Sequence, residues 1–433
     1  MTETMIGLIG LALLLVMFLS GMELGFSMAM LGFLGFSYIV SPKAGLSLLA
    51  QDIFDVSTSY SYTVVPVFIF MGMLAFNAGI ARQLYLCAFR FLGHIPGGLA
   101  MATVGGATAF GSITGSPTAT SATFASVAIP EMDRYRYDKR LSSGVVAASG
   151  CLGPLVPPSN PLIVYGIITE QSIGRLFTAT LIPGLIVSLL FLLIVYGWCR
   201  INTRLGPRGE RSPWRERISS LRKAAPVVVI FIVVVGGLMI GLFTPTEAGG
   251  VGAFAVALLC FIRRDINWQG IIKSTIETLR ASCMVLVLIL GSIIFGHFIA
   301  VTKIPMAAAD WIAGLPFERH WLLVLIALVY LVGGSFIDDL AFLVLATPIL
   351  YPVVSKLGFD LVWFGIFLQI VIMIGVIIPP VAINVFIVKN IAKVPLRVVY
   401  SGTVPFLIGL VLCAFIILLF PQITLFLPNA LGM

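Results

Sequence analysis

A motif rich in glycine, proline and hydroxyl side chains occurs twice in this chain, each time inside otherwise apolar sequence. The first copy occupies residues 115–161 and the second occupies residues 333–384. In each copy an aspartate precedes a Pro-Pro pair by 19 positions: Asp138 precedes Pro157, and Asp360 precedes Pro379. The two aspartates are 222 positions apart, and so are the two prolines. This spacing predicts two related halves, each carrying the same interruption of a helix.

Composition places the chain in a membrane. Of its 433 residues, 59% are hydrophobic and 10% are charged, and the mean hydropathy is +1.10. Apolar stretches long enough to cross ~30 Å of hydrocarbon recur along the chain, whereas a β-barrel shows short alternating segments. The sequence therefore predicts an all-α polytopic membrane protein in a lipid bilayer. The net charge of +8 comes from a few basic connections, which indicates orientation in the membrane and not nucleic-acid binding.

The order of apolar segments divides the chain into a first half at residues 1–199 and a second half at residues 225–433, joined by a basic loop at 200–224. In the first half we expect spans near 5–21, 24–40, 61–78 and 181–199, a polar connection at 41–60, an amphipathic interfacial helix at 80–95, a re-entrant hairpin at 97–131, a broken helix at 138–169 and an interfacial piece at 170–180. In the second half we expect spans near 225–242, 245–262, 276–300 and 403–426, an interfacial stretch at 301–318, a hairpin at 320–356 and a broken helix at 360–391. The arms of the first hairpin are expected to be half-helices, too short to cross alone.

The predicted topology is an inverted repeat. Each half has five crossings and one hairpin, and an odd number of crossings inverts the second half relative to the first. Arginines dominate the loop at 200–224, which places that loop in the cytoplasm. Both termini are then expected outside. The first residues lack a basic leader and a cleavage site, so residues 6–20 are expected to remain as a helix.

Paired hairpins and broken helices are typical of secondary transporters, because unpaired backbone groups are tolerated in a membrane only where they line a polar cavity. Half-helix N-termini favour an anion, and freed carbonyls can bind Na⁺. We expect two pseudo-symmetric cation sites, in which hairpin tips face breaks. The candidate cation-binding residues are Ser116, Thr118, Gly153, Val156 and Pro157 in the first half and Ser335, Asp338, Gly375, Ile378 and Pro379 in the second. The alternative is that these small residues only allow helices to pack closely.

Charged residues outside this pattern have simpler interpretations. Asp338 is expected to bind a cation or cap the second tip, since a carboxylate inside a membrane usually faces a cavity or an ion; solvation at the surface is the alternative for Asp338 and Asp339. Glu247 is expected to cap a helix, and Glu23 at the matching turn is given the same role. The three histidines and six scattered cysteines show no metal-ligand spacing, so no metal centre is expected. The sequence shows no nucleophile–base pair and no phosphate loop, so neither an enzyme nor an ATPase is expected.

Several separated runs resemble the large membrane subunit of tripartite ATP-independent periplasmic (TRAP) transporters. These runs are residues 115–120, 129–132, 156–159, 243–248 and 377–380, and the similarity extends over about 5–426. The resemblance implies a Na⁺-coupled importer in the bacterial inner membrane that works by an elevator-type movement, with interfacial arm helices bracing a scaffold and with periplasmic termini. It implies no cofactor beyond Na⁺ as the coupling ion. The chain departs from the family at Pro117, where the family often has Ser, and at Asp339, where Gly or Pro is common.

The resemblance also implies partners and a substrate class. The partners are an extracytoplasmic substrate-binding protein and a small four-helix membrane subunit; this chain starts directly at the first span of the large subunit, so the small subunit is expected as a separate chain. The substrate is a small organic anion such as a dicarboxylate, a keto acid or sialic acid, bound between the hairpin tips. The candidate substrate-binding residues are Ser116, Thr120, Ser159, Asn160 and Asn384. A stand-alone Na⁺-coupled dicarboxylate carrier that needs no binding protein is the alternative within transport, and an intramembrane enzyme or a channel is the alternative outside it.

Overall fold

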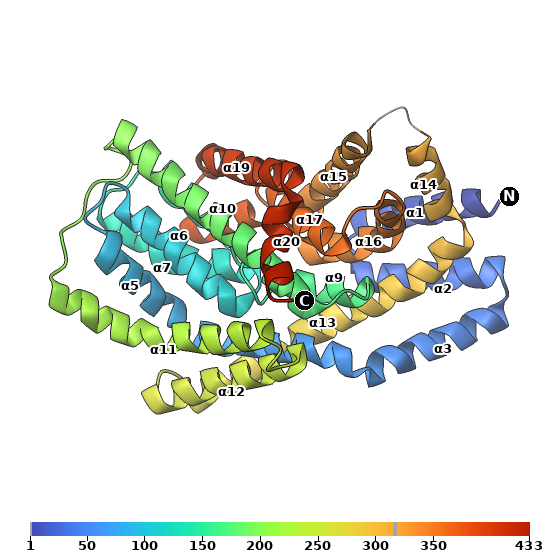
Figure 1. The fold of residues 1–433 in the computed structure, drawn as a ribbon, viewed down its shortest axis with the longest axis horizontal. Helices are drawn as coiled ribbons and strands as arrows, with labels where there is room; N and C mark the ends of the chain where they lie inside the picture. Colours follow the sequence, from blue (N-terminus) through green and yellow to red (C-terminus); the bar gives the residue numbers. More distant parts are fainter. Residues whose placement is uncertain (1, 315–317) are drawn as a thin grey trace.

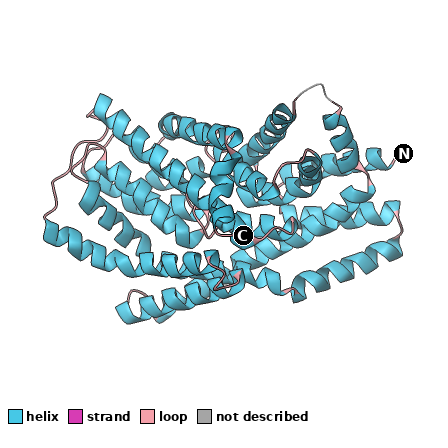
Figure 2. Ribbon diagram, viewed as in Figure 1, coloured by secondary structure: helices cyan, strands magenta, loops and turns pink. Residues whose placement is uncertain are grey.

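The computed structural model describes residues 2–314 and 318–433, and these residues form helices and connecting loops without a strand (Figure 2). The first half contains α1 (Glu3–Leu19), α2 (Leu24–Ile39), α3 (Pro42–Thr58), the 3₁₀ turn η1 (Tyr60–Thr63), α4 (Val64–Asn77), α5 (Ile80–Leu92), α6 (Gly98–Thr114), α7 (Pro117–Arg134), α8 (Lys139–Gly150), α9 (Asn160–Ile168) and α10 (Ile173–Ile201). The second half contains α11 (Trp214–Met239), α12 (Pro245–Arg263), α13 (Trp268–Val301), α14 (Ile304–Ala313), α15 (Arg319–Phe336), α16 (Asp339–Lys356), α17 (Leu361–Gly375), α18 (Ile383–Ala392), α19 (Leu396–Leu419) and α20 (Pro421–Ala430). The predicted all-α class is confirmed.

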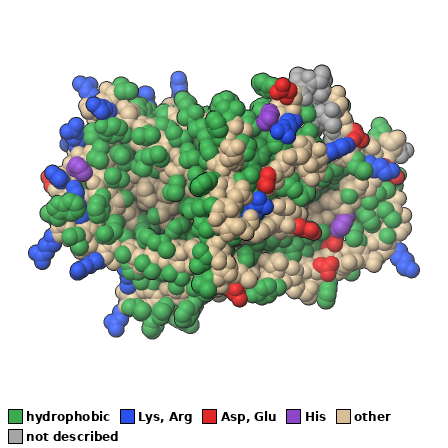
Figure 3. Space-filling model, viewed as in Figure 1, with side chains coloured by type: hydrophobic (Ala, Val, Ile, Leu, Met, Phe, Trp, Pro, Cys, Tyr) green, Lys and Arg blue, Asp and Glu red, His purple; other side chains and the backbone are tan. Residues whose placement is uncertain are grey.

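Within the described ranges, eight helical segments are long and apolar enough to cross a membrane. They are 60–77, α10, α11, α12, α13, α15, α16 and α19, and α1, α2, α17 and α18 are shorter apolar helices. Hydrophobic side chains cover much of the face seen in Figure 3, and Lys and Arg gather at the end where α10 connects to α11. This distribution is that of a multi-pass membrane protein with basic connections.

The two halves contain the same order of helices at an offset of 222 positions. The second arms of the two hairpins, α7 and α16, begin and end at equivalent positions, and α8 and α17 begin at equivalent positions. Both breaks contain a cis Pro-Pro bond, Pro157-Pro158 and Pro379-Pro380. The halves differ before the hairpins, because the first half has α3, η1 and α4 where the second half has the single 34-residue helix α13.

Four predicted boundaries are wrong. The connection at 41–60 is mostly the helix α3, which Ser41 caps by accepting a hydrogen bond from the Ala44 amide (3.2 Å) and which Pro42 starts. The loop at 200–224 ends early, because α11 begins at Trp214 and continues without interruption into its span. The interfacial piece at 170–180 is the first part of α10, and the last predicted span is divided between α19 and α20.

The hairpin arms are also longer than half-helices. The helix α6 has 17 residues, and α7, α15 and α16 have 18 each. At 1.5 Å per residue such a helix is about 26 Å long, which is close to the hydrocarbon thickness. The prediction that the arms are too short to cross alone is therefore wrong, and we keep the word hairpin for the pairs α6–α7 and α15–α16, whose arms contact each other.

Glu247 has the predicted capping role. Its carboxylate accepts hydrogen bonds from the Thr244 amide and hydroxyl (both 2.9 Å), and its own amide donates to the Thr244 hydroxyl (3.3 Å). The same prediction for Glu23 is wrong: Glu23 precedes α2, but its side chain makes no capping hydrogen bond. The difference follows from chemistry, because Thr244 supplies a hydroxyl that exchanges hydrogen bonds with a carboxylate three residues on.

The helices pack as two groups. The frame group contains α1–α4 and α11–α13, in which α2 packs on α13 and α4 packs on α12 and α13. The hairpin group contains α6–α10 and α15–α19, in which α8 packs on α19, α7 on α18, and α9 on α16. Figure 1 shows the first hairpin (α6–α7) and the second hairpin (α15–α16) toward opposite ends, with α9 and α17 between them. Helices from both halves of the sequence therefore build each group.

Tyr137 fastens the base of the first hairpin. Its phenol donates a hydrogen bond to the Pro207 carbonyl (3.0 Å) and accepts one from the Leu99 amide (3.2 Å), an amide in the first turn of α6 that has no partner within the helix. Burial raises the pKa of the Tyr137 phenol, so it remains a protonated donor at physiological pH. The phenol therefore joins α6 to the segment after α10.

Tyr137→Phe is expected to lower the free energy of unfolding by about 1–2 kcal/mol, because two buried hydrogen-bonding groups lose their partner. Denaturation of the detergent-solubilised protein measures the change. Tyr135→Phe is the matched control, since the Tyr135 phenol makes no hydrogen bond to the described residues. Equal stability of the Tyr137 and Tyr135 variants would show that this contact does not hold the hairpin base.

Candidate functional site

The first hairpin tip contacts the first break directly. Gly115 ends α6 in the left-handed conformation (φ +60°), which a residue without Cβ adopts readily. A Cβ on Gly115 would lie 2.6 Å from the Pro158 carbonyl oxygen, and the Asn160 side-chain amide donates to the Thr114 carbonyl (3.4 Å). A Cβ on Gly153 would lie 2.6 Å from the carbonyl oxygen of Ser116. Glycines and carbonyls therefore form this contact, which we call the first seam.

Hydroxyl groups line the inner side of the first seam. Ser116 precedes α7 and caps it by accepting a hydrogen bond from the Ala119 amide (3.3 Å), and its hydroxyl lies 3.1 Å from that of Thr118. Thr120 donates to the Ser116 carbonyl (2.8 Å), and its hydroxyl lies 3.3 Å from that of Thr114. The structure thus brings together Ser116, Thr118, Thr120 and Gly153, as the sequence predicted.

The second seam repeats this arrangement between the second tip and the second break. A Cβ on Gly375 would lie 2.7 Å from the carbonyl carbon of Gly334 and 3.0 Å from the Ser335 amide nitrogen. The Ser335 hydroxyl donates to the Val332 carbonyl in its own helix (2.7 Å). The predicted pairing of Ser335 with Gly375 is therefore present through backbone atoms.

The breaks leave carbonyl oxygens without hydrogen-bond donors in both halves. Within the described ranges, no amide or hydroxyl donates a hydrogen bond to the carbonyls of Val156 and Pro157, or to those of the equivalent residues Ile378 and Pro379. Proline lacks an N–H, so each Pro-Pro pair removes donors that a continuous helix would supply. These oxygens are ligands of the kind that Na⁺ takes at a broken helix.

A cavity of about 480 Å³ lies between the two tips and the frame group. The first tip and the start of α9 contribute Ser116, Thr118 and Asn160, and the second tip contributes Asp338 and Asp339. The opposite wall is apolar and comes from α4 and α13, with Ile69, Met73, Phe76, Met284 and Val285. Lys, Arg and His are absent from the described residues that line this cavity.

The polar walls of this cavity differ in charge. Ser116 and Asp338 lie 222 positions apart and both precede the second arm of a hairpin, so a hydroxyl in one half takes the place of a carboxylate in the other. The helix N-termini of α7 and α9 also line the cavity, and such ends carry partial positive charge. Asp338 is half-buried and Asp339 is 4% exposed. One wall is therefore suited to an anion and the other to a cation.

The remaining predicted residues lie outside the lining of this cavity. Ser159 is buried and caps α9 by accepting from the Leu162 amide (3.4 Å). Asn384 is fully buried, and its side chain donates to the Ala147 carbonyl (3.2 Å). Val156, Pro157, Ile378 and Pro379 belong to the breaks behind the seams.

Sequence reasoning missed a buried polar cluster behind the first tip. Gly150 lies between Ser121 and Asn384, since a Cβ on it would be 1.9 Å from the Ser121 hydroxyl oxygen and 2.7 Å from the Asn384 amide nitrogen. The Ser121 hydroxyl, the Asn384 side-chain oxygen and one oxygen of Asp339 are buried without a hydrogen-bond partner among the described residues. Helical periodicity places Ser121 and Asn384 only on the faces of separate helices, so the signal that joins them is tertiary packing.

Comparison with known proteins identifies the family. Residues 11–423 match the family described as "Tripartite ATP-independent periplasmic transporter, DctM component". The chain is 33% identical over 396 residues to the C4-dicarboxylate TRAP transporter large permease protein DctM of Pseudomonas aeruginosa, covering 91% of this chain and 92% of that protein. It is 32% identical over 413 residues to the sialic acid TRAP transporter large permease protein SiaM of Vibrio cholerae, covering 95% of each.

The fold also resembles a solved transporter structure. The YdaH transporter of Alcanivorax borkumensis superposes with a TM-score of 0.59 at 14% identity, covering 88% of this chain and 89% of that one. This likeness concerns the fold alone. The family match, the two similar permeases and the apolar helices show that the chain is a multi-pass membrane protein and belongs to the family of large permease (M) subunits of tripartite ATP-independent periplasmic transporters.

Proposed function

We propose that this chain uses a Na⁺ gradient to import a small organic anion delivered by an extracytoplasmic substrate-binding protein. The observation that carries the proposal is the cavity between the hairpin tips, which has two aspartates on one wall and lacks a basic side chain among its described lining residues. An anion in this cavity adds to the charge of two carboxylates. Bound cations offset that charge, and the N-termini of α7 and α9 favour the anion.

Each seam is the proposed position of one Na⁺. Carbonyl oxygens without a donor in each break, together with hydroxyls at the first tip and Asp338 at the second, supply the oxygen ligands. Bound Na⁺ then holds each tip against its break and completes the polar walls around the anion. This coupling makes substrate affinity depend on Na⁺, because either ligand stabilises the arrangement that the other needs.

The proposed movement is of the elevator type, with the hairpin group moving against the frame group. The apolar wall that α4 and α13 present to the cavity supports it, because a surface with few hydrogen bonds can be passed without leaving donors unpaired. We further propose that the halves are inverted repeats in the bacterial inner membrane, with periplasmic termini and the segment between α10 and α11 in the cytoplasm. Its many arginines support this orientation.

The substrate is proposed to carry a carboxylate or sulfonate group. Relatives are named for C4-dicarboxylate, sialic acid, isethionate and ectoine transport, and each of these compounds has such a group. The proposed partners are a small TRAP membrane subunit as a separate chain and a substrate-binding protein.

Uptake into liposomes tests the proposal. The chain is reconstituted with its small subunit, and accumulation of radiolabelled organic anions is measured with and without a Na⁺ gradient and a matching binding protein. Uptake that needs both is the expected result. Uptake that needs Na⁺ but no binding protein would favour a stand-alone carrier, and uptake indifferent to Na⁺ would overturn the cation sites.

A further inference from the structure

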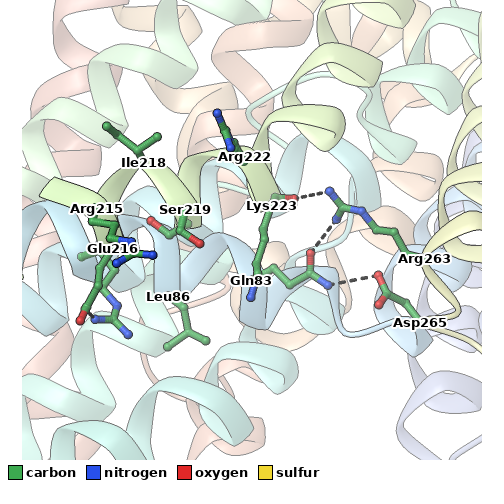
Figure 4. Close-up of a pocket in the computed structure, with 12 residues that line it drawn as sticks. Gln83, Leu86, Arg215, Glu216, Ile218, Ser219, Arg222, Lys223, Arg263 and Asp265 are labelled. Carbon is green, nitrogen blue, oxygen red and sulfur yellow. Dashed lines mark hydrogen bonds and ion pairs between the residues drawn. The ribbon is translucent and has the colours of Figure 1, made fainter.

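A second, larger cavity of about 910 Å³ lies where α5, the first turns of α11 and the end of α12 meet (Figure 4), and it shares no described lining residue with the cavity between the tips. We call it the basic pocket and define it by Gln83, Arg90, Arg215, Arg222, Lys223 and Arg263. With 26 residues α11 is about 39 Å long, which exceeds a ~30 Å hydrocarbon core. Its uninterrupted apolar run begins only at Ala224, so the basic pocket lies where the helix leaves the hydrocarbon.

The positive charge of the basic pocket is only partly neutralised. Five Lys and Arg side chains line it against the two carboxylates of Glu216 and Asp265. Arg90 pairs with Glu216, and Asp265 accepts a hydrogen bond from the Gln83 amide (3.2 Å). Among the described residues, Arg215, Arg222 and Lys223 have no carboxylate within ion-pair distance.

Arg263 adds a charge that is fixed in place but not neutralised. Its guanidinium donates to the Gln83 side-chain oxygen (2.9 Å) and to the Lys223 backbone carbonyl (2.7 Å), and Figure 4 shows these bonds joining the three elements. Both acceptors are neutral. A preorganised guanidinium beside several free cations is a site for a phosphate-type anion.

Apolar side chains adjoin the cations. Leu86 and Ile218 line the same pocket, and they are 39% and 51% exposed. A free inorganic anion gains nothing from such side chains, whereas a lipid that carries both a phosphate and acyl chains contacts both kinds of surface. Basic pockets between helices at the membrane surface bind acidic lipid headgroups.

We propose that the basic pocket binds the headgroup of an anionic phospholipid such as phosphatidylglycerol or cardiolipin. The phosphate is held by Arg222, Lys223 and Arg263, and the acyl chains pass over Leu86 and Ile218. The bound lipid joins α5, which leads into the first hairpin, to α11 of the frame group. The proposal requires only that the chain lies in a membrane and does not depend on the transported substrate.

Native mass spectrometry of the delipidated complex with the small subunit tests the proposal, with phosphatidylglycerol and phosphatidylcholine as probes. The pocket variant combines Arg222→Gln, Lys223→Gln and Arg263→Gln. The control variant combines Arg204→Gln, Arg208→Gln and Arg397→Gln, which removes the same charge from exposed residues outside the basic pocket. Unchanged melting curves establish that both variants fold.

The expected result is retention of phosphatidylglycerol over phosphatidylcholine, weakened about 100-fold in the pocket variant and nearly unchanged in the control, since each basic residue near a membrane contributes roughly a fivefold factor. Equal weakening in both variants would show a general charge effect and overturn the site. If millimolar inorganic phosphate displaced the bound phosphatidylglycerol as effectively as short-chain phosphatidylglycerol does, that result would assign the pocket to a soluble anion. Binding by the isolated chain but not by the complex would assign it to the small subunit; either result overturns the lipid proposal.

Discussion

Gly375→Ala and Gly153→Ala are each expected to slow Na⁺-driven uptake by about 5- to 150-fold. A Cβ at either position would lie 2.6–2.7 Å from backbone atoms of the facing tip, namely the Ser116 carbonyl for Gly153 and the Gly334 carbonyl for Gly375. Backbone cannot move aside as a flexible side chain can, and overpacking typically costs ~1–3 kcal/mol. The tip would be displaced from the break, and the proposed cation ligands would separate. Initial uptake rates in liposomes measure the effect.

Gly236→Ala and Gly250→Ala are the matched controls. Both glycines lie in apolar helices, α11 and α12, and a Cβ on either meets no atom within 4 Å. Their uptake rates are expected to match the parent, with stability raised by roughly 0.5–1 kcal/mol because Ala is the better helix former. Normal uptake by the Gly375 variant, at a protein level equal to that of the controls, would show that the second seam does not need close contact.

Asp338→Asn and Asp339→Asn are each expected to raise the Na⁺ concentration for half-maximal uptake by roughly 10- to 150-fold. Each substitution keeps the shape of the side chain and removes its charge from the cavity, and the loss of an interaction with a charged group costs ~1.5–3 kcal/mol. We expect the larger effect at Asp338, the proposed cation ligand. Asp339 lies beside it, is 4% exposed and has an oxygen without a partner among the described residues, so its charge also acts on a bound cation. Uptake across a series of Na⁺ concentrations provides the measurement.

Na⁺-dependent thermal stabilisation without substrate separates ion binding from transport. The parent is expected to melt at higher temperature in Na⁺ than in K⁺, and the Asp338 variant is expected to lose this difference. Asp133→Asn is the control, because Asp133 is exposed and pairs with Lys139 (2.6 Å) away from the cavity. An unchanged Na⁺ response in both cavity variants would remove the aspartates from the proposed cation site.

The seams were predictable from the sequence because the motif rich in glycine and proline occurs twice, at a constant offset of 222 positions. Glycine and proline restrict the backbone conformation of the segment that holds them, and the repetition of Pro157 and Pro379 at the same offset predicts two breaks of the same kind. Each hairpin is followed directly in the chain by a broken helix. This order was enough to pair each tip with the break in the same half, because few other partners lie within reach of the tip.

The cavity walls were not predictable in the same way. Ile69, Met73 and Met284 line the cavity. The same apolar residue types also face lipid or the protein core, so residue type alone does not show which of them line a cavity. The basic pocket was missed because its residues come from three separate segments, and because the first turns of α11 were expected to be loop. The start of α11 depends on the packing of its first turns against α5. A local sequence pattern carries no information about that packing.

The seams consist mostly of glycine and carbonyl groups, while α4 and α13 contribute the side chains of the facing wall. In the proposed function, contact at the seams and the shape of the facing wall therefore depend on different atoms. A change at Ile69, Met73 or Met284 alters the size and surface of the chamber while leaving intact the backbone contacts that close it. If the proposed function holds, cargo can be changed at the wall without altering the backbone contacts of the seams, and those three positions are the first to randomise when a new specificity is sought.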